Sequence, residues 1–162
     1  MTPFIAVLAA AALAAAACDV RTRRIPNVLT GALAVAGVLM AGLMRGYAGA
    51  AVALATLAIL LVAGTFVFSR AWFGGGDIKL LAAGCCGLVP AQAVDFLLFT
   101  ALCGGLLSLY ALATSRSHGL TTLLITWRPP TTGKRLPYAV AVCGGALCLW
   151  VALLCPAFLP VR

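Results

Sequence analysis

Acidic residues are nearly absent from this chain of 162 residues, which contains three aspartates and no glutamate. Charged residues of both signs make up 9% of the sequence, whereas about 25% is usual for a soluble domain. Intrinsic disorder requires low hydrophobicity, but 64% of these residues are hydrophobic. The composition therefore excludes a water-soluble globular domain and a disordered chain. Together with a mean hydropathy of +1.15, it predicts a polytopic membrane protein in contact with the lipid bilayer.

The residues that build most metal sites are also missing or scattered. The only histidine, His118, falls in a predicted loop, and none of the seven cysteines forms a Cys-x-x-Cys pair. We therefore expect no metal and no cofactor. Most cysteines lie in apolar runs and are predicted to fill space as small hydrophobic side chains. A disulfide between Cys155 and either Cys85 or Cys86 stays open as an alternative.

Apolar runs predict an all-α fold, a six-helix transmembrane bundle that forms one domain over residues 1–162. The predicted helices cover residues 2–17, 28–44, 48–68, 78–89, 91–113 and 137–159. The fourth is too short to span, because its dozen residues rise about 18 Å and the hydrocarbon core is about 30 Å thick. Either the bilayer is thinner there, or the glycine segment 74–76 lies below the surface beside a wet cavity within the protein.

Basic residues are distributed unevenly between the predicted gaps. Nine of the eleven lie in or beside the first, third and fifth gaps, and only Arg45 and Arg162 lie on the other side. Because loops rich in Lys and Arg stay in the cytoplasm, both termini are predicted to face outward. This membrane pattern explains the net charge of +8, so we expect no nucleic-acid binding. A cleaved signal ending near Cys18 is disfavoured, since no basic region precedes the first apolar run.

The first acidic motif lies at a predicted cytoplasmic helix end and reads DVRTRRIPN over residues 19–27. Asp19 is predicted to close the first helix, and Arg21 and Arg24 to lie among lipid phosphates. Pro26 disfavours helix at the residue before it and can start the next helix, near Asn27. On its own, Asp19 could also be a counter-ion for the neighbouring arginines.

The second acidic motif places three glycines before an aspartate, as Gly74, Gly75, Gly76 and Asp77, with Lys79 two residues later. Glycines allow backbone angles and close approaches that other residues forbid. Asp77 is predicted to open the fourth helix, near the positive end of its dipole. On its own, Asp77 could also be a helix N-cap, since Asp is among the best capping residues.

Taken together, Asp19 and Asp77 are predicted to share the cytoplasmic face, whereas Asp95 lies near the opposite face as an interfacial polar residue. Two carboxylates a few ångströms apart cannot both ionise cheaply, so one keeps its proton near neutral pH. The ionised carboxylate can activate a water for attack on a peptide carbonyl, while the protonated one polarises that carbonyl and then protonates the leaving amine. This pattern predicts aspartic peptidase chemistry.

These motifs resemble those of the type IV prepilin peptidase family, which consists of intramembrane aspartic peptidases. The similarity is greatest to the small members that serve tight-adherence (Flp-type) pili. The Asp-x-Arg…Ile-Pro-Asn and Gly-x-Gly-Asp-x-Lys motifs and a later Pro-Tyr pair are present here as Asp19, Arg21, Ile25, Pro26 and Asn27; Gly74, Gly76, Asp77 and Lys79; and Pro137 and Tyr138. The resemblance extends over essentially the whole chain.

The resemblance implies that Asp19 and Asp77 cleave the leader from a prepilin or pseudopilin, at the cytoplasmic boundary of a bacterial or archaeal inner membrane. It implies that Lys79 and the glycines shape the site. Larger members carry a Cys-x-x-Cys insertion that accompanies N-methylation of the product, and its absence here speaks against N-methyltransferase activity. A non-catalytic membrane assembly subunit and a small transporter that uses Asp77 as its carrier carboxylate remain alternatives.

Overall fold

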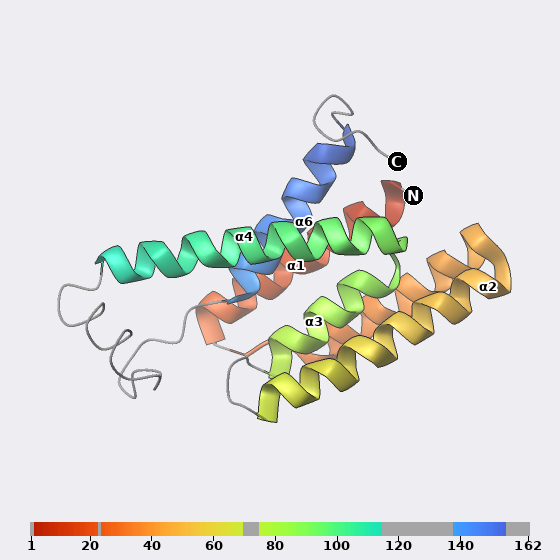
Figure 1. Cartoon of the computed structure of the whole chain (residues 1–162), viewed down its shortest axis with the longest axis horizontal. Coiled ribbons are helices and arrows are strands. Elements are labelled where there is room, and N and C mark those ends of the chain that lie inside the picture. Colours follow the sequence, from red (N-terminus) through yellow and green to blue (C-terminus); the bar gives the residue numbers. More distant parts are fainter. Residues whose placement is uncertain (1, 23, 70–74, 115–137, 155–162) are drawn as a thin grey trace.

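The computed structural model describes residues 2–22, 24–69, 75–114 and 138–154 (Figure 1). All regular structure in these ranges is helical, which confirms the all-α prediction. The helices are α1 (Thr2–Thr22), α2 (Asn27–Ser69), α3 (Gly75–Cys86), α4 (Pro90–Thr114) and α6 (Tyr138–Leu154). A bundle of six separate helices is not seen in the described ranges. Gly74, Pro137 and Cys155 lie outside them, as does most of the gap predicted before the last helix.

The long helix α2 is interrupted at Gly46. This residue has a φ of 67° and a ψ of −162°, which is not a helical conformation. A positive φ costs glycine little, because it has no Cβ. Figure 1 shows the chain running out along the first part of α2 and returning along the second. The two parts of α2 cover the separate helices predicted over residues 28–44 and 48–68.

Three of these helices are long and apolar enough to cross a membrane. The candidate spans are Phe4–Thr22, Asn27–Phe66 and Pro90–Tyr110, and α6 is a shorter apolar helix. Large hydrophobic side chains such as Val28, Leu43 and Val62 lie exposed on the outside of the bundle. An apolar surface of this extent is suited to lipid and not to water. The chain is a membrane protein with several apolar helices.

The core forms where α3 meets α1, α4 and α6. Helix α6 packs against both α1 and α4, while α3 packs mainly along α2. Residues 82–88 are all buried, so the end of α3 and the turn after it are enclosed by protein. Leu8 of α1 and Phe96 of α4 are fully buried, and both approach Gly84 of α3. A helix too short to span is therefore surrounded by longer ones.

Two predicted helix boundaries are wrong. Helix α1 continues to Thr22 instead of ending at residue 17, because no proline or glycine follows residue 17 until Pro26. As a result, Asp19 lies within the last turns of α1 and does not close it. The predicted short helix exists but covers Gly75–Cys86 instead of 78–89. Gly75 and Gly76 are therefore helical, and Asp77 lies in the first turn.

Close contact between α2 and α3 depends on glycines of α2. A Cβ on Gly37 would lie 2.6 Å from Cys86 Sγ and 3.0 Å from the backbone nitrogen of Gly87, and one on Gly64 would overlap the side chain of Ile78. Cys86 Sγ lies 3.6 Å from the carbonyl oxygen of Ala34 across the same interface and 3.2 Å from the carbonyl oxygen of Ala83 within α3, so its single proton is shared between the two acceptors. Small residues let helix backbones approach in this way, which is how membrane helices commonly associate.

We predict that Gly37→Ala destabilises the fold, because the added methyl group meets backbone as well as a side chain. Overpacking of this kind costs about 1–3 kcal/mol, or a fall in Tm of about 3–10 °C. Gly31→Ala is the matched control in the same helix, since a Cβ there has no neighbour within 4 Å. Its Tm is expected to be unchanged or slightly higher. Equal Tm values for both variants in detergent would contradict this packing.

Candidate active site

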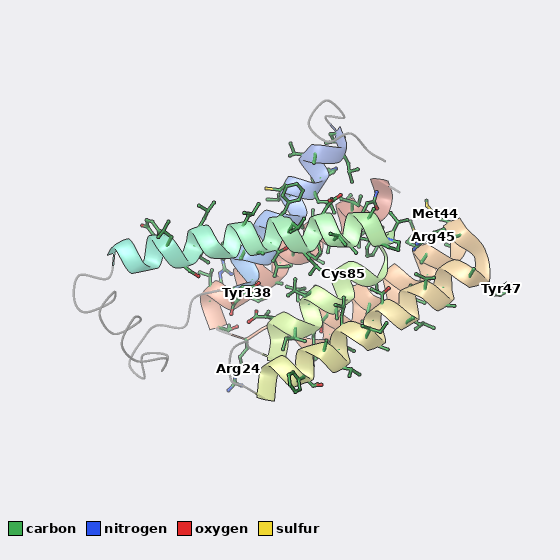
Figure 2. The ribbon with its side chains drawn as sticks, viewed as in Figure 1. Arg24, Met44, Arg45, Tyr47, Cys85 and Tyr138 are labelled. Carbon is green, nitrogen blue, oxygen red and sulfur yellow. The ribbon has the colours of Figure 1, made fainter. Side chains whose placement is uncertain are left out.

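Asp77 lies at the start of the buried helix α3 and is half-buried. Free backbone N–H groups in the first turn of a helix favour a negatively charged side chain there. Tyr138, the first residue of α6, lies within electrostatic range of the Asp77 carboxylate. Its ring also packs near α4, because a Cβ on Gly104 would lie 3.3 Å from Tyr138 Cε2. Figure 2 shows Tyr138 where α6 begins.

The Asp77 motif contacts the motif around Asp19 at two points. Lys79 Nζ donates a hydrogen bond of 3.1 Å to Asn27 Oδ1, which joins α3 to the beginning of α2. A Cβ on Gly76 would lie 3.4 Å from the Cβ of Ile25, so the chain between α1 and α2 lies directly against the first turn of α3. Segments about fifty residues apart in the sequence are thus brought together at one end of the bundle.

Asp19 approaches this end from α1. It lies in the last turns of the helix and is half-buried. Thr22 Oγ1 donates to the carbonyl oxygen of Cys18 at 2.8 Å, which supports the last turn around Asp19. The chain then turns before α2, where the carbonyl oxygen of Pro26 accepts a hydrogen bond of 3.1 Å from the backbone nitrogen of Leu29. Pro26 therefore precedes the first turn of α2, as its sequence position predicts.

The remaining predicted site residues differ in their placement. Arg21 and Arg24 are exposed, and Figure 2 shows Arg24 at the edge of the helices. Gly75 begins α3. Asp95 lies on α4 in the second turn from its start, at the end of α3 opposite Asp77. The structure thus brings together residues of both acidic motifs with Tyr138, while Asp95 lies apart from them.

The sequence indicates Asn27 and Lys79 as site residues, but it does not predict that they form a hydrogen bond. The contact of Ile25 with Gly76 was not predicted. Both residues belong to the predicted motifs, because Ile25 precedes the proline of the first motif and Gly76 precedes the aspartate of the second. Nothing in the sequence alone pairs them. Among the described residues, no group of three or more His, Cys, Asp or Glu side chains is arranged to hold a metal ion.

The arrangement defines a class of membrane protein in which two aspartate motifs meet at one end of a helical bundle. The sequence profile of the type IV leader peptidase family matches residues 6–109, a range that contains both motifs. The chain therefore belongs to the type IV leader peptidase family, which confirms the resemblance at the level of the family. Members of this family are aspartic peptidases that act on prepilins, so the chain is an enzyme of this class. No curated protein and no solved structure matches the chain.

We predict that cysteines introduced as Ile25→Cys and Gly76→Cys form a disulfide on mild oxidation, in a background without the native cysteines. A Cβ separation near 3.4 Å is close to the range of about 3.5–4.5 Å found in disulfides. Ile25→Cys with Gly105→Cys is the control pair, because a Cβ on Gly105 of α4 would have no neighbour within 4 Å. Mass spectrometry of the intact chain detects the bond. Cross-linking of the control pair alone would show that the two motifs do not meet.

Proposed function

We propose that this enzyme is a membrane-embedded endopeptidase that removes the leader from type IV or Flp-type prepilins or pseudopilins, with Asp19 and Asp77 as its catalytic pair. The observation that carries the proposal is the meeting of the two motifs. Gly76, the residue before Asp77, lies against Ile25, and Lys79 bonds Asn27. Both aspartates are half-buried and lie close in the chain to these contacts.

In the proposed mechanism, the two carboxylates share one proton, because two adjacent carboxylates cannot both ionise cheaply. The ionised carboxylate takes a proton from a water molecule as that water attacks the peptide carbonyl. The protonated carboxylate donates its hydrogen bond to the carbonyl oxygen and then passes a proton to the leaving amine. The pair titrates as a unit, so its pH profile belongs to both groups.

The neighbours of Asp77 fit a role in positioning it. Lys79 is held by Asn27, and its ammonium group adds positive charge near the first turn of α3. Tyr138 presents a phenol within electrostatic range of the Asp77 carboxylate. The backbone at Gly76 lies against Ile25, since a Cβ there would be in van der Waals contact with the Ile25 side chain. We assign Lys79, Asn27, Tyr138 and Gly76 as positioning residues and keep the chemistry for the two aspartates.

In the membrane, we propose six helices, with the two parts of α2 counted separately on either side of Gly46. The excess of basic residues in alternate gaps favours a cytoplasmic location for the ends that carry Asp19 and Asp77, with both termini outward. The apolar helix of the substrate then stays in the bilayer of a bacterial or archaeal inner membrane while its basic leader is released into the cytoplasm. The link between α1 and α2 is short and contains no Cys-x-x-Cys motif. Leader cleavage without N-methylation is therefore the proposed activity.

We predict that Asp19→Asn and Asp77→Asn each reduce prepilin processing by at least about 100-fold, because each removes one member of the acid–base pair. Asp95→Asn is the matched control and is expected to process at the wild-type rate, since Asp95 lies on α4 away from both motifs. The measurement is leader removal from a co-expressed prepilin, with Tm as the check on folding. Normal processing by either variant would show that Asp19 and Asp77 are not the catalytic pair.

A second prediction concerns the bond between Lys79 and Asn27. Lys79→Met and Asn27→Leu are each expected to lower kcat/KM by about 3–10-fold, a modest effect because both side chains are exposed. The double variant is expected to be no slower than the slower single variant, since both changes break the same bond. Multiplication of the two losses in the double variant would show that the residues act separately.

A further inference from the structure

A small cavity lies at the end of the bundle opposite Asp77. It is partly open and is lined by Phe4 of α1, by residues of α2 just before Gly46, by the turn after α3 and by the first turn of α4. The residues that line it are Phe4, Met40, Ala41, Met44, Arg45, Gly87, Leu88 and Gln92. Its volume is about 10 Å³, which is at the lower limit for holding one water molecule.

Three buried polar atoms around this cavity have no hydrogen-bond partner within the described part of the chain. They are Nε and Nη2 of Arg45 and Oε1 of Gln92. An unsatisfied buried polar group is costly, and more so when it belongs to a charged side chain. Two donors and one acceptor match what a water molecule offers, because its oxygen accepts two hydrogen bonds and its protons donate up to two.

We propose that this cavity is a binding site for one ordered water molecule, which accepts hydrogen bonds from Arg45 Nε and Nη2 and donates one to Gln92 Oε1. Three hydrogen bonds are typical of a buried water. An anion fits less well, because the cavity is small and the side-chain oxygen of Gln92 would face the negative charge. The site is independent of the proposed peptidase pair, since it lies at the other end of α3.

The bound water would join the tip of α2 to the beginning of α4. Arg45 lies one residue before Gly46, where α2 reverses, and Gln92 begins the return of the chain into α4. Gly87, which also lines the cavity, packs against the ring of Phe4 from α1. Tyr47 is 97% exposed at this tip of α2 (Figure 2). The water then holds the tip of α2 to the first turn of α4.

The test is a double-mutant cycle in the full chain with Arg45→Met, Gln92→Leu and both together, with Tm measured in detergent. Each single variant is expected to lose about 2–6 °C, and the double variant to lose no more than the larger of the two. Tyr47→Phe is the control for the exposed tip and is expected to leave Tm unchanged. Additive losses in the double variant would overturn the proposal, because they show that no shared partner joins the two side chains.

Two further results separate water from other occupants. Sodium chloride is expected to change the Tm of the wild-type chain and of Arg45→Met by the same amount. If chloride raises the Tm of the wild type alone, an anion occupies the site and the proposal is overturned. In an experimental map that resolves ordered water, a single peak between Arg45 and Gln92 is expected. Direct contact of the two side chains, without a peak between them, would also overturn it.

Discussion

The close approach of α3 to α2 is the constraint on which the rest of this structure depends. In lipid, apolar side chains gain little by meeting one another, so the distance at which backbones can pack decides which helices associate. Glycines of α2 allow that approach near both ends of α3, at Gly37 beside Cys86 and at Gly64 beside Ile78. A helix of 12 residues cannot reach across a bilayer, and it is stable here because longer helices surround it.

The position of Asp77 follows from this packing. Once α3 is fixed along α2, its first turn lies beside the beginning of α2, where Lys79 reaches Asn27, and beside the link to α1, where Gly76 meets Ile25. The exposed hydrogen bond between Lys79 and Asn27 contributes little stability by itself. Its value is geometric, because it fixes one motif relative to the other after apolar packing has brought them together. Tyr138, the first residue of α6, lies within electrostatic range of the same carboxylate.

The helices and the two aspartate motifs could be predicted from the sequence, and the predictions that were wrong or missing have physical causes. Long apolar runs predict helices, and the scarcity of acids isolates Asp19 and Asp77 as residues that a membrane protein keeps for a reason. The end of α1 was predicted too early, because polar residues such as Asp19 and Arg21 stay helical when no proline or glycine intervenes. Which helices pair was not predictable, since these helices are apolar on all sides and no single face marks the partner. The contact of Ile25 with Gly76 depends on that pairing and was therefore missed.

The two ends of α3 place polar groups in opposite settings, and the difference explains what each end can do. At the first turn, Asp77 is half-buried and Lys79 is exposed, so this end of α3 is not sealed by the protein. Beyond the last turn, Arg45 and Gln92 turn buried polar atoms toward a cavity the size of one water. Hydrolysis needs access and an exchangeable water, whereas a structural polar contact needs enclosure. A short buried helix supplies both conditions, because its two ends lie at different depths of the same protein.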